Sequence, residues 1–222
     1  MSGFKLAIDG PAGSGKSTIS ALIAKKLNWT HIDTGAMYRA VTLKALELKV
    51  DLNDESSYRF LETTNIHYDF DRIFIDDRDV TQAIRSEGVT NNVSLVSSFP
   101  YVRRKLVDLQ KQAANYGNIV MDGRDIGTVV LPDANVKVFL TANVEERAKR
   151  RYKENIKKGK DQHISKVIED IVVRDQKDST RKESPLRKAD DAIIMDTTYL
   201  TIDEVVEKII ELTDKKENKH GV

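Results

Sequence analysis

The chain contains no cysteine, and this absence excludes disulfide cross-links, thiolate metal sites and cysteine nucleophiles. No apolar run approaches the roughly 18 residues that a membrane-spanning helix needs. The first residues also lack the basic and then apolar pattern of a signal peptide. With 222 residues, the chain is long enough to bury a substantial apolar core. We therefore expect a cytoplasmic protein without a membrane partner.

The chain also lacks an excess of charge of one sign. The chain has 36 Lys and Arg against 35 Asp and Glu, which gives a formal net charge of +1. This balance argues against the broad positive field of a nucleic-acid binder, so we expect no nucleic-acid partner. The four histidines lack metal-ligand spacing, and we interpret them as structural or solvated. No interface patch stands out, and we expect a monomer.

Short apolar runs that are typical of buried parallel strands recur along the chain. Helix-length segments separate them, and this alternation predicts an α/β fold with a parallel five-stranded sheet and helices on both faces. Four of the five runs end at aspartate, and ligands of such sheets bind at the carboxyl ends of the strands. The expected strands are 5–9, 30–33, 118–122, 136–140 and 192–196; the expected helices are 19–27, 36–49, 100–112, 143–158, 164–181 and 202–213.

Residues 51–87 break this rhythm. A short helix near 55–63 is followed by two alternating runs, 66–70 and 72–75, which predict a small antiparallel insertion near 64–86.

Two charged helices follow the fourth strand and are joined by residues 159–161, so we interpret them as a mobile cover. The charged tail, 214–222, is expected to fray.

The most informative motif follows the first strand directly and has the spacing Gly-x-x-x-x-Gly-Lys-Ser. A loop that wraps a diphosphate aims consecutive backbone N–H groups inward, which requires glycine where side chains would collide. Lys16 can bridge the β- and γ-phosphates, Ser17 can bind Mg²⁺, and the following helix offers its positive N-terminal end. The alternative is an ordinary glycine-rich turn. The expected triphosphate-binding residues are Gly10, Pro11, Ala12, Gly13, Ser14, Gly15, Lys16, Ser17 and Thr18.

Polar residues follow the second strand at 33–39. Thr34 and Arg39 begin the next helix, and there Arg39 can hold a second anion near the first. The structural alternative makes Thr34 a helix N-cap and Arg39 a solvated surface charge.

The third acidic strand end carries Asp122, Arg124 and Asp125 in close succession. A carboxylate at this place in P-loop proteins belongs to the Mg²⁺ shell. Burying an Arg124–Asp125 pair without a ligand is costly, so we favour ligand contact over a purely structural ion pair.

Arginines also recur at helical spacing in the two charged helices. Arg147 and Arg151 are four residues apart, and Arg174 and Arg181 lie two turns apart with Asp178 between them. Such charges usually face solvent. Guanidinium groups nevertheless suit the charge that phosphoryl transfer spreads over equatorial oxygens.

Together these segments, in this order and with the insertion between the second and third core strands, resemble the bacterial cytidylate kinases over nearly the whole chain. The resemblance implies ATP as donor, Mg²⁺ as cofactor, and CMP or dCMP as acceptor, with CDP or dCDP as product. It also implies core segments 1–36, 99–145 and 181–222, a monophosphate-binding region 37–98, and a lid with flanking helices at 146–180.

The resemblance further assigns roles residue by residue. Ser94, Arg103 and Asp125 match the cytosine readers, Thr34, Arg39, Arg124 and Arg181 match the acceptor-phosphate contacts, and Arg174 and Asp178 match the pentose contacts. Arg147 would stack on the adenine, and Arg151 would reach the transferred phosphoryl group. Lys16, Arg124, Arg151 and Arg181 are then the catalytic residues, and Ser17 binds Mg²⁺ with Asp33 and Asp122 as outer-shell groups.

Three other functions remain as alternatives. A P-loop kinase for a different small acceptor would keep Lys16 and Ser17. A nucleotide switch would share the loop, but the Asn-Lys-x-Asp guanine-reading pattern is absent. A nucleic-acid-binding module built on the arginine-rich helices would bind oligonucleotides in a salt-dependent way.

Overall fold

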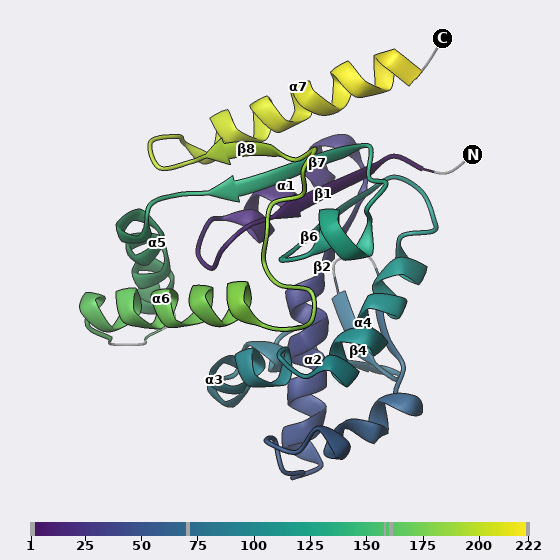
Figure 1. Ribbon diagram of the computed structural model, residues 1–222, viewed down its shortest axis with the longest axis vertical. Coiled ribbons are helices and arrows are strands. Elements are labelled where there is room, and N and C mark those ends of the chain that lie inside the picture. Colours follow the sequence, from purple (N-terminus) through teal and green to yellow (C-terminus); the bar gives the residue numbers. More distant parts are fainter. Residues whose placement is uncertain (1–2, 70–71, 158, 160–161, 221–222) are drawn as a thin grey trace.

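A five-stranded parallel sheet forms the centre of the molecule (Figure 1). The structure, a computed structural model, describes residues 3–69, 72–157, 159 and 162–220, with side chains up to residue 216. The strand order is β2-β6-β1-β7-β8, and every neighbouring pair in this sheet is parallel. This confirms the predicted α/β class. The strands are β1 (Lys5–Asp9), β2 (Thr30–Asp33), β6 (Ile119–Gly123), β7 (Val136–Thr141) and β8 (Ile193–Asp196).

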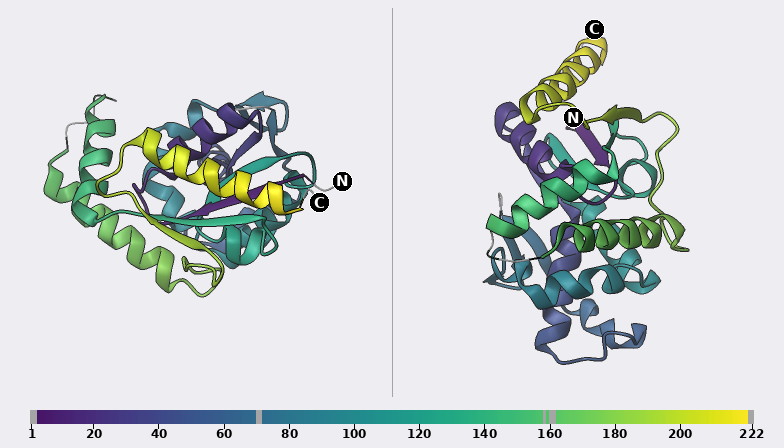
Figure 2. Two further views of the ribbon diagram at one scale, coloured as in Figure 1. Left: turned by 90° about the horizontal axis from the view of Figure 1, so that it is seen from above. Right: turned by 90° about the vertical axis from the view of Figure 1, so that its left-hand side faces the viewer.

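Both faces of the sheet are covered, because alternate residues of β1 point into different apolar layers. Leu6 and Ile8 pack with helices α1 (Lys16–Leu27) and α7 (Ile202–His220), whereas Ala7 packs with the cluster on the other face. The strand is thus buried on both sides, which explains its continuous apolar run. Figure 2 shows α7 lying across the sheet when the molecule is viewed from above.

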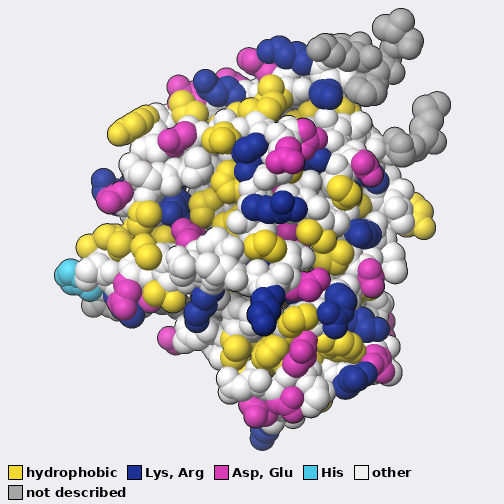
Figure 3. Space-filling model, viewed as in Figure 1, with side chains coloured by type: hydrophobic (Ala, Val, Ile, Leu, Met, Phe, Trp, Pro, Cys, Tyr) yellow, Lys and Arg dark blue, Asp and Glu magenta, His cyan; other side chains and the backbone are white. Residues whose placement is uncertain are grey.

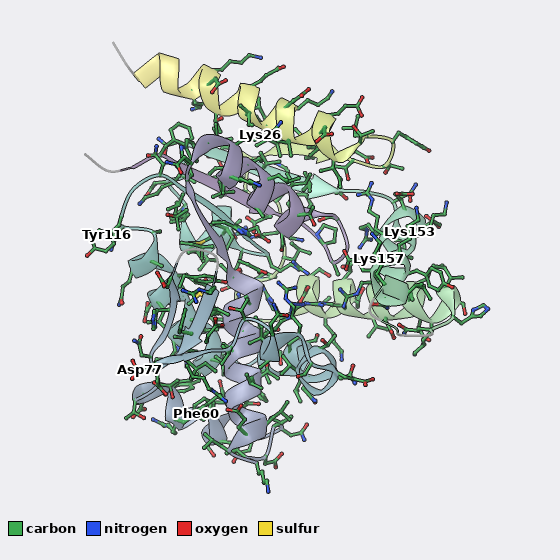
Figure 4. The ribbon with its side chains drawn as sticks, turned by 180° about the vertical axis from the view of Figure 1, so that it is seen from behind. Lys26, Phe60, Asp77, Tyr116, Lys153 and Lys157 are labelled. Carbon is green, nitrogen blue, oxygen red and sulfur yellow. The ribbon has the colours of Figure 1, made fainter. Side chains whose placement is uncertain are left out.

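The region between β2 and β6 extends away from the sheet and has its own apolar core. Its three-stranded sheet is antiparallel, as predicted. Its elements are α2 (Thr34–Glu47), η1 (Glu55–Glu62), β3 (Ile66–Asp69), β4 (Arg72–Ile75), β5 (Arg78–Asp79), η2 (Ala83–Arg85), α3 (Glu87–Val96) and α4 (Pro100–Ala113). In Figure 4 the labelled Phe60 and Asp77 lie at the end of the molecule opposite Lys26.

Helix α3 was not predicted. Its sequence contains glycine, two asparagines and several β-branched residues, which have low helix propensity. Buried Val89, Val93 and Val96 pack this helix into the same apolar core as α2. Tertiary packing therefore outweighs the local propensity.

Helices α5 (Val144–Lys157) and α6 (Ile164–Thr180) confirm the two charged helices of the predicted cover. They pack on each other through Ala148, Val167 and Ile171. Of their expected connection, residues 160 and 161 lie outside the described residues.

Of the tail that was expected to fray, residues 214–220 continue helix α7, contrary to the prediction, and residues 221 and 222 lie outside the described residues. Within the described ranges, no helix is both long and apolar enough to cross a lipid bilayer.

Candidate active site

The glycine-rich loop connects β1 to α1, so the strand–loop–helix context of the motif is confirmed. Gly15 precedes the helix with a φ of +91°, a left-handed conformation that favours glycine. No side chain caps the N-terminus of α1. The first N–H groups of this helix are therefore directed toward the loop, where a phosphate can accept from them.

Lys16 is folded back onto the loop. Its Nζ donates to the Pro11 carbonyl at 2.7 Å and to Ser14 Oγ at 3.3 Å, and the residue is 6% exposed. Burial lowers the pKa of Lys16 well below its usual range, and the positive charge of Arg124 lowers it further. The positive charge of Arg174 acts in the same direction. A bound triphosphate would relieve this repulsion.

Ser17, Asp122 and His31 form a hydrogen-bonded row at the carboxyl end of the sheet. Ser17 Oγ donates to Asp122 Oδ2 at 2.8 Å, and His31 Nε2 lies 2.7 Å from Asp122 Oδ1. Burial opposes the charged form of His31, but the hydrogen bond to Asp122 and the negative charges of Asp122 and Asp33 together outweigh it and raise the pKa of His31. A hydroxyl beside a carboxylate is an oxygen donor set that suits Mg²⁺ bound together with phosphates.

The structure at the end of β2 contradicts one alternative interpretation of the sequence. The N-cap of α2 is Asp33, whose Oδ1 accepts from the Ala36 N–H at 3.1 Å, so the interpretation of Thr34 as the N-cap was wrong. Thr34 is buried and donates instead to the Asp122 carbonyl at 2.8 Å. Burial, together with repulsion by Asp122, raises the pKa of Asp33.

The structure gathers arginines from distant segments around two buried aspartates. Arg124 Nε donates to Asp178 Oδ2 at 2.8 Å, and Arg174 Nε lies 4.0 Å from the same oxygen. Arg181 lies 3.8 Å from Asp125 and 3.7 Å from Asp178. Arg124 and Asp125 thus each form an ion pair with a residue that is distant in the sequence, as the structural alternative allows, and contact of these two residues with a ligand stays a prediction.

We call Arg39, Arg103, Arg124, Arg174 and Arg181 the arginine cluster. They outnumber the buried aspartates Asp125 and Asp178, so the cluster carries an excess of positive charge. Burial lowers the pKa of Arg174 to about 10, with repulsion by Arg124 as the second cause. Burial also lowers the pKa of Arg39, and Arg151 and Arg85 contribute repulsion. Among the described residues, four guanidinium groups have a buried nitrogen without a hydrogen-bond partner, and an anion would satisfy them. These nitrogens are Arg39 Nε, Arg103 Nε, Arg174 Nε and Arg181 Nη2.

Two of the three expected base readers, Arg103 and Asp125, are in direct contact. Arg103 Nη2 donates to Asp125 Oδ2 at 2.6 Å, and Arg103 Nη1 donates to the Ser97 carbonyl at 3.1 Å. Ser94 lies one helical turn before Ser97, whose Oγ donates to the Ser94 carbonyl. The Arg103 guanidinium lies over the Tyr38 ring, 5.3 Å from its centroid. Arg103 of α4 and Asp125, which follows β6, are therefore in direct contact, and Ser97, which follows α3, links Arg103 to the backbone of Ser94.

The two arginines of α5 have different surroundings. Arg147 is 5% exposed, and its guanidinium donates to the carbonyls of Ala142 and Ala12 and to Asp175. Arg151 is partly exposed and pairs with Glu154 at 3.4 Å. In Figure 4 the labelled Lys153 and Lys157 come from the same helix, and both are exposed. Stacking of Arg147 on the adenine stays a prediction.

Sequence reasoning missed three residues of this site. Asp9 accepts from the Ile126 and Gly127 N–H groups, His31 contacts Asp122, and Asp175 accepts from the Ala12 N–H. Asp9 could have been found from the sequence, because it ends the first apolar run as other aspartates end the later ones. For the other two no sequence pattern links the partners, which are 91 and 163 residues apart.

The fold and the site define a class. A glycine-rich phosphate-binding loop (the P-loop, residues 10–17) lies at the carboxyl edge of a parallel sheet, and, in the described part of the chain, arginines with unpartnered buried nitrogens belong to the same site. Basic and acidic side chains are interspersed over the face that Figure 3 shows. This is the architecture of a P-loop kinase.

Comparison with known proteins specifies the family. The family model for cytidylate kinase matches residues 6–215. A cytidylate kinase of Acholeplasma laidlawii is 61% identical over 212 residues, covering 96% of each chain, and one of Bacillus subtilis is 50% identical, covering 95% of this chain and 96% of its own. An uncharacterized protein from Eubacterium ventriosum shares the fold, with a TM-score of 0.55 at 13% identity, covering 95% of this chain and 98% of its own. The chain belongs to the cytidylate kinase family.

Proposed function

We propose that this chain transfers the γ-phosphoryl group of ATP to CMP or dCMP, giving ADP with CDP or dCDP. The observation that carries the proposal is the group of buried guanidinium nitrogens without hydrogen-bond partners among the described residues. One of them belongs to Arg174, whose neighbour Asp175 accepts from the Ala12 N–H of the P-loop. Two anion sites then adjoin, one made of main-chain N–H groups and one of arginines. The family membership supports the same reaction.

On the donor side, residues 10–18 surround the triphosphate. Lys16 turns from the Pro11 carbonyl to the β- and γ-phosphates, because a phosphate is the stronger partner for an ammonium group. Ser17 and Asp122 would hold Mg²⁺, with Asp33 beyond them, and their oxygens fit this ion. When bound, Mg²⁺ neutralises charge on the donor phosphates.

On the acceptor side, Arg39, Arg124 and Arg181 hold the monophosphate, and the Thr34 hydroxyl lies nearby. Arg174 and Asp178 contact the pentose. Burial opposes ionisation of Asp178, but the charges of Arg124 and Arg174 outweigh this effect and lower its pKa. Asp178 therefore stays an acceptor for sugar hydroxyl groups at neutral pH.

Ser94, Arg103 and Asp125 read the base. The carboxylate of Asp125 accepts from the N4 amine of cytosine, whereas uracil would present its O4 to that carboxylate. Arg103 and Ser94 donate to N3 and O2. A site built in this way disfavours UMP, because the mismatch leaves buried polar groups unpaired.

The chemical step needs no general base, because the acceptor phosphate is already a nucleophile. An acceptor oxygen forms the new bond to the γ-phosphorus, and the bond from that phosphorus to the β,γ-bridging oxygen breaks. The protein aligns the groups and stabilises charge on the equatorial oxygens, which is the role of Lys16, Arg124, Arg151 and Arg181. Residues 146–180 exclude water as a lid.

The test is ADP release with ATP and Mg²⁺ against CMP, dCMP, UMP and AMP as acceptors. We expect CMP and dCMP to give the highest kcat/KM. Equal or higher kcat/KM with UMP or AMP would contradict the proposed base readers. Activity only with an acceptor outside this panel would favour the alternative of a P-loop kinase for another small molecule.

A further inference from the structure

The backbone of Ala12 in the P-loop is held at both its N–H and its carbonyl group by side chains of the two charged helices. The Ala12 N–H donates to Asp175 Oδ1 at 3.1 Å, and the Ala12 carbonyl accepts from Arg147 Nη1 at 2.9 Å. Arg147 Nη1 also donates to Asp175 Oδ2 at 2.5 Å. The three groups form a closed set of hydrogen bonds, which we call the Ala12 clamp.

The clamp is rigidly supported. Arg147 Nε donates to the Ala142 carbonyl at 3.0 Å, and the neighbouring Ala148 is buried between α5 and α6. The backbone also fits closely, because a Cβ added at Gly13 would lie 3.1 Å from the Arg147 carbonyl oxygen. The side chains of Arg147 and Asp175 are 6% and 22% exposed, respectively. These contacts fix the backbone of the P-loop on both sides of the Ala12 Cα.

The clamp also connects the two anion sites. Asp175 lies on α6 directly after Arg174 and one turn before Asp178, and both of these neighbours belong to the arginine cluster. One helix therefore contacts the donor loop and carries acceptor-side residues. A fixed distance between the two anion sites is what an in-line transfer requires.

We propose that Arg147 and Asp175 are positioning residues that shape the P-loop for the polyphosphate of the donor, and that the clamp fixes this loop to the acceptor side of the site. The proposal rests on the proposed function for the identity of the acceptor. The effect of the clamp on the P-loop does not depend on which acceptor the protein uses, because this effect concerns only binding of the donor's polyphosphate. The adenine-stacking prediction for Arg147 gives a different expectation, which the experiment separates.

The experiment measures binding of ATP, inorganic tripolyphosphate and CMP by calorimetry to the full chain without other ligands. The variants are Asp175→Ala, Asp175→Asn and Arg147→Lys, and the matched control is Asp170→Asn. Asp170 lies on the same helix with an exposed side chain, and its contacts are to Lys166 and Gln162. Asp175→Asn keeps one acceptor for the Ala12 N–H and the shape of the side chain, so it covers the case in which Asp175→Ala fails to fold.

For both Asp175→Ala and Arg147→Lys we expect ATP and tripolyphosphate affinities to fall together by about tenfold to hundredfold, which corresponds to about 1.4 to 2.8 kcal/mol. We expect Asp175→Asn to lie between wild type and Asp175→Ala, and CMP affinity to change by less than about threefold, which is under 0.7 kcal/mol. A double variant, Asp175→Ala with Arg147→Lys, should be no weaker than the more impaired single variant, because the two residues act as one unit.

Tripolyphosphate affinity within twofold of wild type in folded Asp175 and Arg147 variants would overturn the proposal. A loss for ATP without a loss for tripolyphosphate in Arg147→Lys would overturn it in favour of a contact with the base. If wild type does not phosphorylate CMP but the tripolyphosphate losses appear, the proposed function fails and the clamp stands.

Discussion

The Arg103 guanidinium donates a 2.6 Å hydrogen bond to the Asp125 carboxylate, and the two side chains are only 1% and 5% exposed. Each partner has a further contact, Arg103 with the Ser97 carbonyl and Asp125 with Arg181 at 3.8 Å. A buried ion pair is weak evidence for stability, because desolvation offsets much of the attraction. Since stability does not explain this pair, we propose that it serves recognition of the acceptor.

The first prediction concerns this pair. Replacing Asp125 by asparagine converts the acceptor for the cytosine amine into a group that can also donate to uracil O4. We expect Asp125→Asn to lower kcat/KM for CMP by about 10²-fold or more and to lower it much less for UMP, since a mismatched polar group costs about 1–3 kcal/mol or more. Steady-state kinetics with both acceptors measure the ratio. An unchanged CMP to UMP ratio in the folded variant would contradict the assignment.

A second prediction concerns developing charge. Lys16→Ala and Arg124→Ala each remove a cation from the region where the two anion sites adjoin. We expect turnover to fall by about 10²–10³-fold in each variant with the fold intact, as for other electrostatic stabilisers of a transition state. Lys25→Ala is a suitable control, because Lys25 is an exposed residue of the same helix as Lys16. Near-normal turnover in folded Lys16→Ala would contradict the donor-side assignment.

Much of this architecture was predictable from local patterns. Buried strands such as β1 and β6 appear as continuous apolar runs, and the P-loop has a spacing that backbone geometry dictates. That Arg124 and Asp125 contact a ligand stays a prediction, which depends on the position of these charges at a strand end. These inferences depend only on neighbours along the chain.

The remainder depends on partners that sequence order does not reveal. Helix α3 forms because its three buried valines pack into the core shared with α2, although its composition is poor for a helix. His31 contacts Asp122, and Asp175 contacts Ala12, only because parallel strands and α6 bring them together. Arg147 carries no sign in the sequence that its guanidinium is buried rather than solvated.

A third prediction compares the effects on stability of replacing a buried and an exposed isoleucine of α7. Ile209 is fully buried in the cluster shared with α1 and β1, whereas Ile202 on the same helix is 51% exposed. We expect Ile209→Ala to lower the free energy of unfolding by about 2–5 kcal/mol, because it removes buried methyl groups and leaves a cavity. Ile202→Ala should change it by less than about 1 kcal/mol. Chemical denaturation of both variants measures the difference, and similar losses would contradict the packing of α7.

The last prediction concerns Asp9, which lies at the end of β1 immediately before the P-loop. Its two oxygens accept from the Ile126 and Gly127 N–H groups at 2.8 and 2.7 Å. Burial raises the pKa of Asp9 from 3.8 to about 6, the two N–H groups oppose this shift, and the charge of Asp125 adds to it. Carbon-13 NMR of the Asp9 carboxyl group should therefore give a titration midpoint near 6.

The sign of the effect on stability follows from proton binding. Between pH 4 and pH 6 the folded state retains the Asp9 proton while the unfolded chain has lost it, so the free energy of unfolding falls as pH rises through this window. The loss due to Asp9 approaches about 3 kcal/mol, since one pKa unit corresponds to about 1.4 kcal/mol. Asn in place of Asp9 does not titrate. As pH rises from 4 to 7, the free energy of unfolding of wild type should therefore fall relative to that of Asp9→Asn. A difference between the two proteins that is independent of pH would show that Asp9 ionises near its ordinary value.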